Sequence, residues 1–347
     1  MNGDLCHDLL FKDVKPKLAF ADNQKGFEEW KKEIKEKLIS LLGYERIAEN
    51  QCPLNITVER KEEKDGYTLI RFTFESEVGA VVPCYLLIPK TGKEKYPVAI
   101  VLHGHSTGFH NAIGEIKTPY DQPFHPVQQF ALQAVENGFI ALAIEQRAMG
   151  ERRSIRSYGK DNVFHQRPHM CAHTALTAIA LGRTVIGERV WDVSKAIDAL
   201  SAFPECDTEH IVITGNSGGG TTSYYAACLE ERIKLCVPSC AFCSYKGSIF
   251  DIEHCACNYI PDAANWFEMA DLSVLIAPRD LVIVAGKKDP IFPIECVRED
   301  FETVKRIFDK GGAKDRCSLV ETEKDHYWCS DVIWPKIAEK AKELKFF

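Results

Sequence analysis

The sequence predicts an α/β fold in which a mostly parallel central sheet is flanked by helices. From residue 96 onward, short continuous apolar runs alternate with amphipathic segments of helical period. Continuous apolar runs are typical of strands buried on both faces of a parallel sheet, and such a sheet needs helices on both sides. The apolar runs lie at residues 98–102, 139–144, 211–213, 235–237, 281–285 and 317–320, and amphipathic segments lie at 127–137, 189–203 and 294–308.

Residues 1–50 are expected to form a helical N-terminal extension. Apolar side chains recur at spacings of three and four from Phe27 to Leu41, with lysines and glutamates between them. This pattern indicates a solvated amphipathic helix rather than a basic arm. Its apolar stripe, which includes Trp30 and Leu38, has to pack on the main body or on another subunit, so homo-oligomerisation is one hypothesis.

Residues 51–347 are predicted to form the main domain, which begins with antiparallel strands. The hydrophobic period changes to two after residue 54, and Lys64-Asp-Gly66 is typical of a hairpin turn. A later irregular stretch, residues 243–270, is expected to form a lid-like insert. The strands predicted for the beginning of the domain lie at residues 55–58, 67–74 and 81–88.

The longest irregular stretches point to the position of a functional site. Residues 104–126, 146–165 and 243–270 each follow a predicted strand. In open α/β sheets, ligands bind beyond the carboxyl ends of the strands. We therefore expect the site to be built from these stretches and from the turns after the later strands.

Composition and charge exclude several function classes. The chain is 45% hydrophobic and 27% charged, with a net charge of −7, which argues against nucleic acid or an anionic membrane as partner. A bilayer-spanning run of about 18 apolar residues is absent from the sequence. The polar, acidic N-terminus does not look like a secretion signal, and the 14 scattered cysteines are typical of reduced, buried thiols. A cytoplasmic location is expected.

One motif carries the main functional hypothesis. Gly215-Asn-Ser-Gly-Gly219 follows the apolar run 211–213, and helix-compatible residues continue to Ala227. This is G-x-S-x-G between a strand and a helix, the arrangement that lifts a serine hydroxyl clear of the backbone. Ser217 is therefore the candidate nucleophile. The alternative is a glycine-rich turn that binds a phosphate or only reverses the chain.

A serine nucleophile needs a base, and the base needs an acid to orient it. Asp289 lies in the turn after the apolar run 281–285, and His326 lies in the turn after the last run. Their predicted roles follow from the Ser-His-Asp template: His326 takes and returns a proton, and Asp289 orients the imidazole. Asp325 is a competing acid, but its position next to the histidine makes it poorly placed to reach the ring.

The oxyanion hole is expected to consist of backbone N–H groups. The first donor is Gly218, the residue after the nucleophile, and the second should come from the loop after residues 98–102. That loop reads His103-Gly-His105, and the N–H of His105 is the predicted second donor. His103 is expected to shape this loop through hydrogen bonds rather than act as a base.

With these residues placed, the segment from about 80 to 340 resembles the α/β-hydrolase superfamily, in its dienelactone hydrolase-like and acetyl xylan esterase-like branch. The resemblance implies the α/β-hydrolase fold and carboxylic ester hydrolysis, often deacetylation of a sugar, with Ser217, Asp289 and His326 as triad. Dienelactone hydrolases proper use a cysteine nucleophile instead, and the deacetylases commonly have Gln where this chain has Gly218. The remaining matching residues are His103-Gly-His105, Glu145 to Glu151, Trp191-Asp192 and Ala277-Pro-Arg279.

Three further residues are candidates for substrate binding. Arg147 can bind a substrate carboxylate or hydroxyl, or it can brace a loop through a carboxylate. Tyr259 and Trp266 lie in the expected lid, where aromatic rings could stack on a sugar. The resemblance implies small esters or acetylated sugars as substrates.

Two groups of residues invite a metal hypothesis. His165, His169 and His173 recur every four residues, but Pro168 interrupts the helical pattern. His254-Cys-Ala-Cys257 has thiols close together, but no second cysteine pair has zinc-site spacing. We expect neither a metal nor a cofactor.

Two other function classes stay open on the sequence. A serine peptidase or amidase uses the same residues, although the chain has no propeller-sized N-terminal domain of the kind seen in the prolyl oligopeptidase branch. A non-catalytic binding module is the third hypothesis, although such proteins usually lack a triad member.

Overall fold

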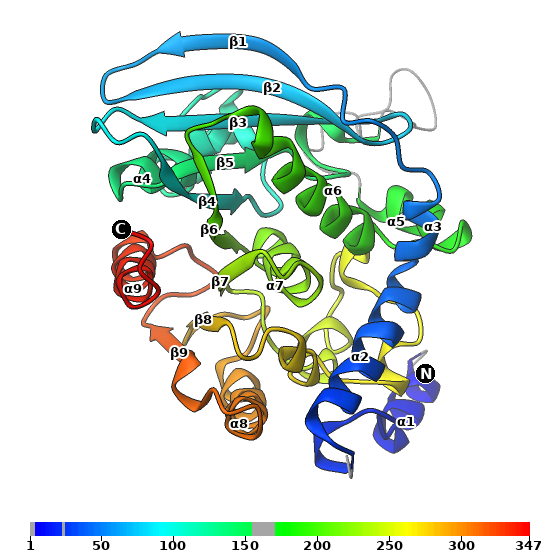
Figure 1. Ribbon diagram of the computed structural model, residues 1–347. Helices are drawn as coiled ribbons and strands as arrows, with labels where there is room; N and C mark the ends of the chain where they lie inside the picture. The colour runs from blue at the N-terminus through cyan, green and yellow to red at the C-terminus, as the bar shows by residue number, and fades with distance from the viewer. Residues whose placement is uncertain (1–3, 23–24, 155–170) are drawn as a thin grey trace.

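The computed structural model describes residues 4–22, 25–154 and 171–347. Within these residues a nine-stranded sheet forms the centre (Figure 1). Its strands are β1 (Thr57–Glu63), β2 (Tyr67–Glu77), β3 (Ala80–Pro89), β4 (Tyr96–Leu102), β5 (Ile140–Ile144), β6 (Cys206–Asn216), β7 (Ile233–Ser239), β8 (Asp280–Gly286) and β9 (Cys317–Thr322).

The order in which the strands are added to the sheet reverses at β4. The order is β1-β2-β3-β5-β4-β6-β7-β8-β9, so β4 lies between β5 and β6. β1, β2, β3 and β5 pair antiparallel in turn, whereas all pairs from β5 to β9 are parallel. Because the chain moves outward in opposite directions from β4, the loops at the carboxyl ends of β4 and β6 separate there and leave a crevice.

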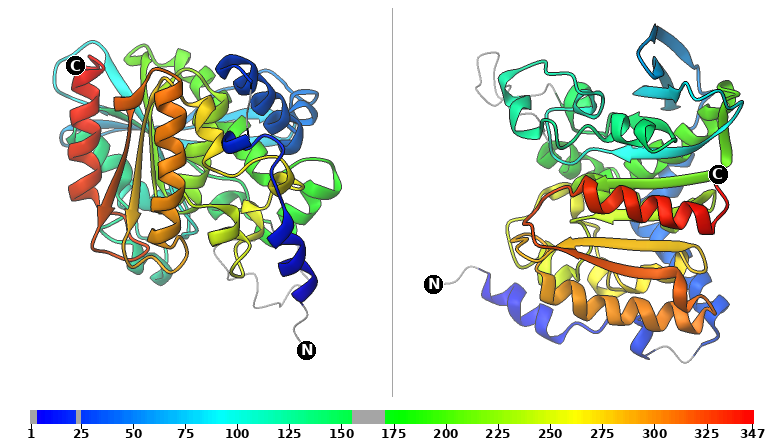
Figure 2. Two further views of the ribbon diagram at one scale, coloured as in Figure 1. Left: turned by 90° about the horizontal axis from the view of Figure 1, so that it is seen from below. Right: turned by 90° about the vertical axis from the view of Figure 1, so that its left-hand side faces the viewer.

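Helices cover both faces of the sheet (Figures 1 and 2). Side chains alternate between the faces as the strand period requires: Ile100 of β4 belongs to one core cluster and Val101 to the other. α4 and α9 cover the Val101 face, whereas α2, α6, α7 and α8 cover the Ile100 face. The helices are α1 (Leu5–Asp13), α2 (Phe27–Leu42), α3 (Tyr44–Ala48), α4 (Phe130–Glu136), α5 (Cys171–Ala180), α6 (Val185–Ala199), α7 (Gly218–Leu229), α8 (Ile294–Lys310) and α9 (Ser330–Glu343).

The predicted N-terminal helix packs on the main body. α2 spans Phe27–Leu42 and buries Trp30, Ile34 and Leu38 in the same cluster as the sheet. The indole N–H of Trp30 donates to the carbonyl of Leu18 at 2.9 Å. Each such buried side chain contributes about 1.5–3 kcal/mol relative to an exposed one.

The predicted fold class is confirmed, and the differences concern the ends of elements. The hairpin at residues 64–66 joins β1 to β2 as expected. The helix expected at 189–203 begins earlier, at Val185, because Thr184 caps it by accepting the N–H of Gly187 at 3.0 Å.

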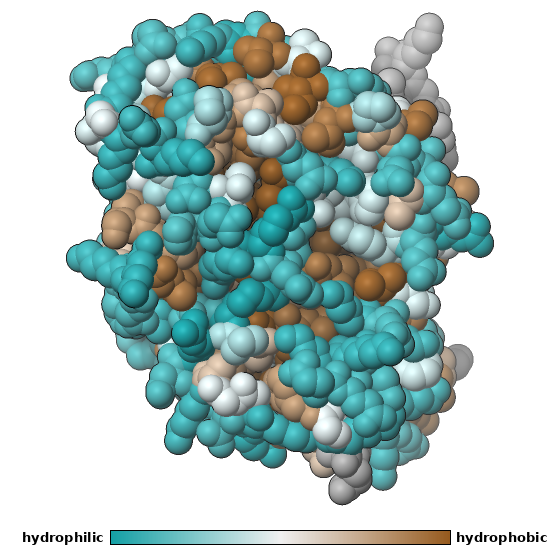
Figure 3. Space-filling view, in the orientation of Figure 1, coloured by the Kyte–Doolittle hydropathy of each residue, from teal (hydrophilic) through white to brown (hydrophobic). Residues whose placement is uncertain are grey.

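The surface is mostly hydrophilic, as expected for a globular chain with many charged residues. Hydrophilic residues cover most of the face seen in Figure 3. Across the ranges that the structure describes, none of the helices combines the length and the apolar character that a bilayer crossing requires.

Candidate active site

Ser217 lies at a sharp turn between β6 and α7. β6 ends at Asn216, α7 begins at Gly218, and Ser217 has φ 55° and ψ −124°. A positive φ is rare for a residue with a side chain and persists only where the surroundings hold it. The N–H of Ser217 donates to Ser239 of β7 at 2.9 Å, and its carbonyl accepts from Thr221 at 2.8 Å. These bonds hold the strained turn at the carboxyl end of the sheet.

The loop after β4 presses against this turn. A Cβ on Gly104 would come within 2.8 Å of the Asn216 carbonyl oxygen and 3.1 Å of Ser217 Cβ. Only glycine permits this approach, so Gly104 brings the following residue, His105, next to the serine.

His326 and Asp289 meet although they follow different strands. Nδ1 of His326 lies 2.8 Å from Oδ2 of Asp289, which is 5% exposed. Oδ1 of Asp289 accepts the N–H groups of Ile291 at 2.8 Å and Phe292 at 3.1 Å, so both carboxylate oxygens are held. The Phe292 ring lies nearly parallel to the imidazole at 5.9 Å. Asp325, the competing acid, is exposed.

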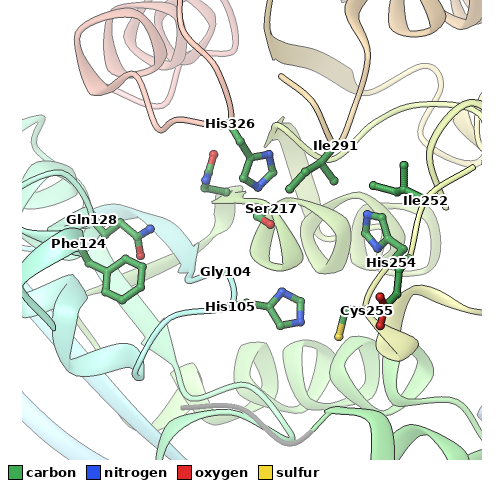
Figure 4. A pocket seen from close by; sticks show the side chains of 12 residues that line it. Gly104, His105, Phe124, Gln128, Ser217, Ile252, His254, Cys255, Ile291 and His326 are labelled. Carbon is green, nitrogen blue, oxygen red and sulfur yellow. The ribbon is translucent and has the colours of Figure 1, made fainter. Parts of the chain in front are cut away.

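Ser217 and His326 line one pocket of about 420 Å³. Figure 4 shows Ser217 between His326 on one side and His105 on the other. Several lining residues were not among the predicted site residues, although they lie in the irregular stretches 104–126 and 243–270. The pocket is lined by Gly104, His105, Phe124, Gln128, Asn216, Ser217, Ile252, Glu253, His254, Cys255, Ile291 and His326.

The two predicted oxyanion donors lie side by side. A Cβ on Gly218 would come within 3.0 Å of Cε1 and 3.1 Å of Nδ1 of His105. The imidazole of His105 therefore occupies the space that a side chain at position 218 would need. This contact gives a physical reason for glycine where related deacetylases commonly have glutamine.

His103 braces the loop that carries His105. Its Nε2 lies 2.9 Å from Oε1 of the fully buried Glu145. The side-chain amide of Gln146 donates to the carbonyl of His103 and accepts from the hydroxyl of Thr222 in α7 at 2.6 Å. The loop after β4 is thus tied to the end of β5 and to α7.

Arg147 does not line the pocket, and of its two expected roles its contacts are those of the brace. Its Nε and Nη2 lie 3.0 Å from the two oxygens of Asp192, and other contacts reach Glu77 at 2.7 Å and Glu188 at 3.3 Å. Although burial opposes it, Arg147 and Arg152 hold the pKa of Asp192 well below its ordinary value. The guanidinium is occupied by carboxylates and braces the loop after β5.

Tyr259 and Trp266 also lie away from the pocket, so their expected stacking on substrate is wrong. The hydroxyl of Tyr259 donates to the carbonyl of Ile249 at 2.9 Å. The indole of Trp266 contacts the ammonium groups of Lys17 and Lys37, at 4.3 and 3.7 Å from the ring. Tyr259 therefore stabilises the 243–270 stretch internally, and Trp266 joins it to the N-terminal segment.

Two side chains near the Ser217 pocket, an imidazole and a thiol, have shifted pKa values. Burial, followed by the charges of His105 and His326, lowers the pKa of His254 to about 4. Burial raises the pKa of the Cys240 thiol, beside Asp289, to about 12. Cys240 is therefore protonated at neutral pH and does not compete with Ser217 as nucleophile.

The two groups considered for metal binding have different outcomes. His165 and His169 lie outside the described residues, and His173 is exposed on α5. His254-Cys-Ala-Cys257 lies on the pocket wall, where Cys255 and Cys257 gather with His105 and a third thiol, that of Cys171.

Comparisons with known proteins agree with this fold. YtaP, a proposed hydrolase of Bacillus subtilis (strain 168), is 23% identical over 299 residues, covering 85% of this chain and 93% of its own. A proposed acetyl xylan esterase from Bacteroides fragilis NCTC 9343 superimposes with a TM-score of 0.79 at 16% identity, over 96% of this chain and 94% of that one. A glucuronoyl esterase from Solibacter usitatus gives 0.67 at 12% identity, over 95% and 98%.

These structural matches show a shared fold. The family assignment comes from a sequence model described as the Abhydrolase family, which matches residues 4–243, more than half of the chain. The chain therefore belongs to the Abhydrolase family, and the predicted resemblance to α/β-hydrolases is confirmed.

Proposed function

We propose that this protein is a serine carboxylic-ester hydrolase that acts through an acyl-enzyme and deacetylates a carbohydrate or another small ester. The observation that carries the proposal is the pairing of His326 Nδ1 with Asp289 Oδ2 at 2.8 Å, in the pocket that also exposes Ser217 on its strained turn. A nucleophile, a base and an orienting acid in one pocket are what acyl transfer requires.

In the proposed mechanism, the Ser217 hydroxyl attacks the ester carbonyl while Nε2 of His326 takes its proton. The resulting oxyanion accepts hydrogen bonds from the backbone N–H groups of His105 and Gly218, and each such donor is typically worth about 2.7–4 kcal/mol of barrier. Return of the proton to the alcohol oxygen releases the alcohol and leaves acyl-Ser217. Water then attacks this ester with the same base, which releases the acid and restores the serine. Asp289 holds the imidazole in the required tautomer.

The pocket supports a neutral substrate. Among the described residues that line it there is neither lysine nor arginine, and Glu253 contributes a carboxylate. A substrate that carries a free carboxylate would meet this negative charge without a cationic partner. The name of the proposed Bacteroides esterase supports acetylated sugars as the first class to test.

A panel of esters tests the proposal. It contains nitrophenyl esters from acetyl to octanoyl, acetylated xylose and a methyl glucuronate ester, each assayed with wild type and Ser217→Ala. We expect preference for acetyl groups, activity on acetylated xylose and loss of activity in the variant. A peptide anilide is included, since faster turnover of the anilide would replace the esterase hypothesis with an amidase. Ester hydrolysis that survives in Ser217→Ala would contradict the mechanism.

A further inference from the structure

Four side chains with metal-binding chemistry meet beside the pocket, and two of them, His105 and Cys255, line it. Sγ of Cys257 lies 3.3 Å from Nε2 of His105, and Sγ of Cys171 lies 3.5 Å from the same nitrogen. The sulfurs of Cys255 and Cys257 are 3.3 Å apart. All four ligand atoms lie within 4.8 Å of one another. In Figure 4 the His105 ring points toward Cys255 and away from His326.

The separations match one coordination sphere. A tetrahedral zinc ion with Zn–S of about 2.3 Å and Zn–N of about 2.0–2.1 Å places its ligand atoms roughly 3.5–3.8 Å from each other. The sulfurs of Cys255 and Cys257 are too far apart for a disulfide, whose bond is about 2.05 Å long. Three cysteines and one histidine are also a known set of structural zinc ligands.

A buried positive charge lies beside the thiols. Arg189 is 2% exposed, and its Nη2 is 3.6 Å from Sγ of Cys171. Its Nε and Nη2 donate to the carbonyl of Arg147 at 3.2 and 2.8 Å, and the charged groups that act on it most strongly are the thiols of Cys257, Cys171 and Cys255. Buried charges are normally compensated. A zinc ion with three thiolates and a neutral imidazole carries one net negative charge, which the guanidinium would balance.

The cluster also has hydrogen-bond donors directed at its sulfurs. The amide of Asn258 lies 3.8 Å from Sγ of Cys257, and the guanidinium of Arg189 lies 3.6 Å from Sγ of Cys171. Groups of this kind orient metal ligands and tune their basicity.

We propose that His105, Cys171, Cys255 and Cys257 bind one structural zinc ion. This site departs from the expectation that the protein binds no metal, and it does not depend on ester hydrolysis. Its ligands come from the loop after β4, the first residue of α5 and the 243–270 stretch. The ion would join these segments and fix His105 against Gly218 at the edge of the pocket.

The test is the zinc content of the full-length protein. Protein purified from zinc-supplemented cells under reducing conditions is analysed by plasma mass spectrometry. We expect about one zinc per chain in wild type, and loss of that zinc in Cys171→Ala and Cys257→Ala. Cys206→Ala is the matched control, because Cys206 is also buried but lies at the start of β6. Ser217→Ala should keep its zinc, so failure of the esterase hypothesis leaves this result unaffected.

A second measurement covers variants that fail to fold. Wild-type protein is treated with a mercurial thiol reagent in the presence of a colorimetric zinc chelator, and the same protein is reconstituted with Co²⁺. Zinc release during thiol modification, and the thiolate charge-transfer and tetrahedral d–d absorption of bound cobalt, would support the site. Three results would overturn it: wild type without stoichiometric zinc after reconstitution, equal loss in Cys206→Ala, or a disulfide among these cysteines in protein purified without oxidant.

Discussion

The two walls of the pocket are built in different ways. One wall carries Ser217 and His326, with Asp289 in contact with the imidazole, and each of the three lies in the turn directly after a strand of the parallel sheet. The other wall carries His105, His254 and Cys255, and the thiols of Cys171 and Cys257 contact His105 next to it. We call this the second wall.

The difference shows what a sheet does for a site. β6, β7, β8 and β9 are neighbours in parallel register, so their carboxyl ends, and the turns that follow them, must lie along one edge. No comparable register relates residue 105 to residues 171 and 257. That wall depends on local hydrogen bonds, on packing and, in our proposal, on a metal ion.

The largest expected effect belongs to the strand-end wall. Asp289→Asn should lower kcat for nitrophenyl acetate by about 10⁴-fold, because an amide favours the wrong tautomer of His326. Steady-state kinetics and the melting temperature separate this effect from unfolding. Asp325→Asn is the matched control and should change kcat little. If Asp325→Asn has the larger effect, the acid has been assigned to the wrong residue.

The next effect concerns the stability contribution of the buried ion pairs around Arg147. Arg147→Met leaves Glu77, Asp192 and Glu188 with an uncompensated buried charge, so the free energy of unfolding should fall by about 3–5 kcal/mol. Urea denaturation measures this loss. Arg298→Met, which breaks surface ion pairs at 41% side-chain exposure, should cost about 0–1 kcal/mol. Equal losses would show that the buried network contributes no more than the surface pairs.

The two walls touch at Gly218, where a smaller effect is expected. In Gly218→Ala the new Cβ would lie 3.0 Å from Cε1 of His105, which is closer than carbon atoms normally pack. The imidazole or the loop after β4 must therefore move. Displacement of one oxyanion donor should lower kcat by roughly 10²-fold with little change in KM. Gly26→Ala, at a position with open space around it, is the control. Unchanged kcat in Gly218→Ala would show that His105 tolerates displacement.

The smallest effect is a pH dependence of the free energy of unfolding, which comes from three acidic side chains: Asp300, Glu268 and Asp271. Burial, and then the charge of Glu268, raises the pKa of Asp300 to about 7; burial raises that of Glu268 to about 7 and that of Asp271 to about 6. The buried thiol of Cys243 and the half-buried thiol of Cys296 lie near the carboxyl of Asp300.

A raised folded pKa means that the folded state binds more protons than the unfolded state between about pH 4 and pH 7, so stability falls as pH rises through that window. Asp300→Asn cannot ionise, so its stability should not fall in this way as pH rises. Its gain in stability should be roughly 1–2 kcal/mol at pH 8 and smaller at pH 5, whereas Glu299→Gln, exposed on the same helix, should show no such trend. A gain that is equal at both pH values would contradict the shift. Thermal melts at the two pH values measure it.

The sequence predicts the sheet well because its signals are local. Each expected apolar run coincides with a strand, and the turns that contain Ser217, Asp289 and His326 follow from that order. The strained backbone at Ser217 is readable from the glycines on either side of it.

The second wall was not predictable from the same signals. Tyr259 bonds within the 243–270 stretch itself, and Trp266 contacts two lysines of the N-terminal segment, and the sequence gives no signal for either contact. Cys171 and His105 have no spacing that relates them to Cys257, and the contact appears only when α5 and the loop after β4 are placed in space.

Covalent labelling of the folded protein tests the central claim most directly. Wild type is incubated with a fluorophosphonate, and the adduct is located by peptide mass spectrometry. We predict one adduct per chain on Ser217, with labelling much slower in His326→Ala because the base that activates the hydroxyl is gone. The absence of an adduct in folded wild type, or an adduct on a different residue, would contradict the account and favour a non-catalytic member of the family.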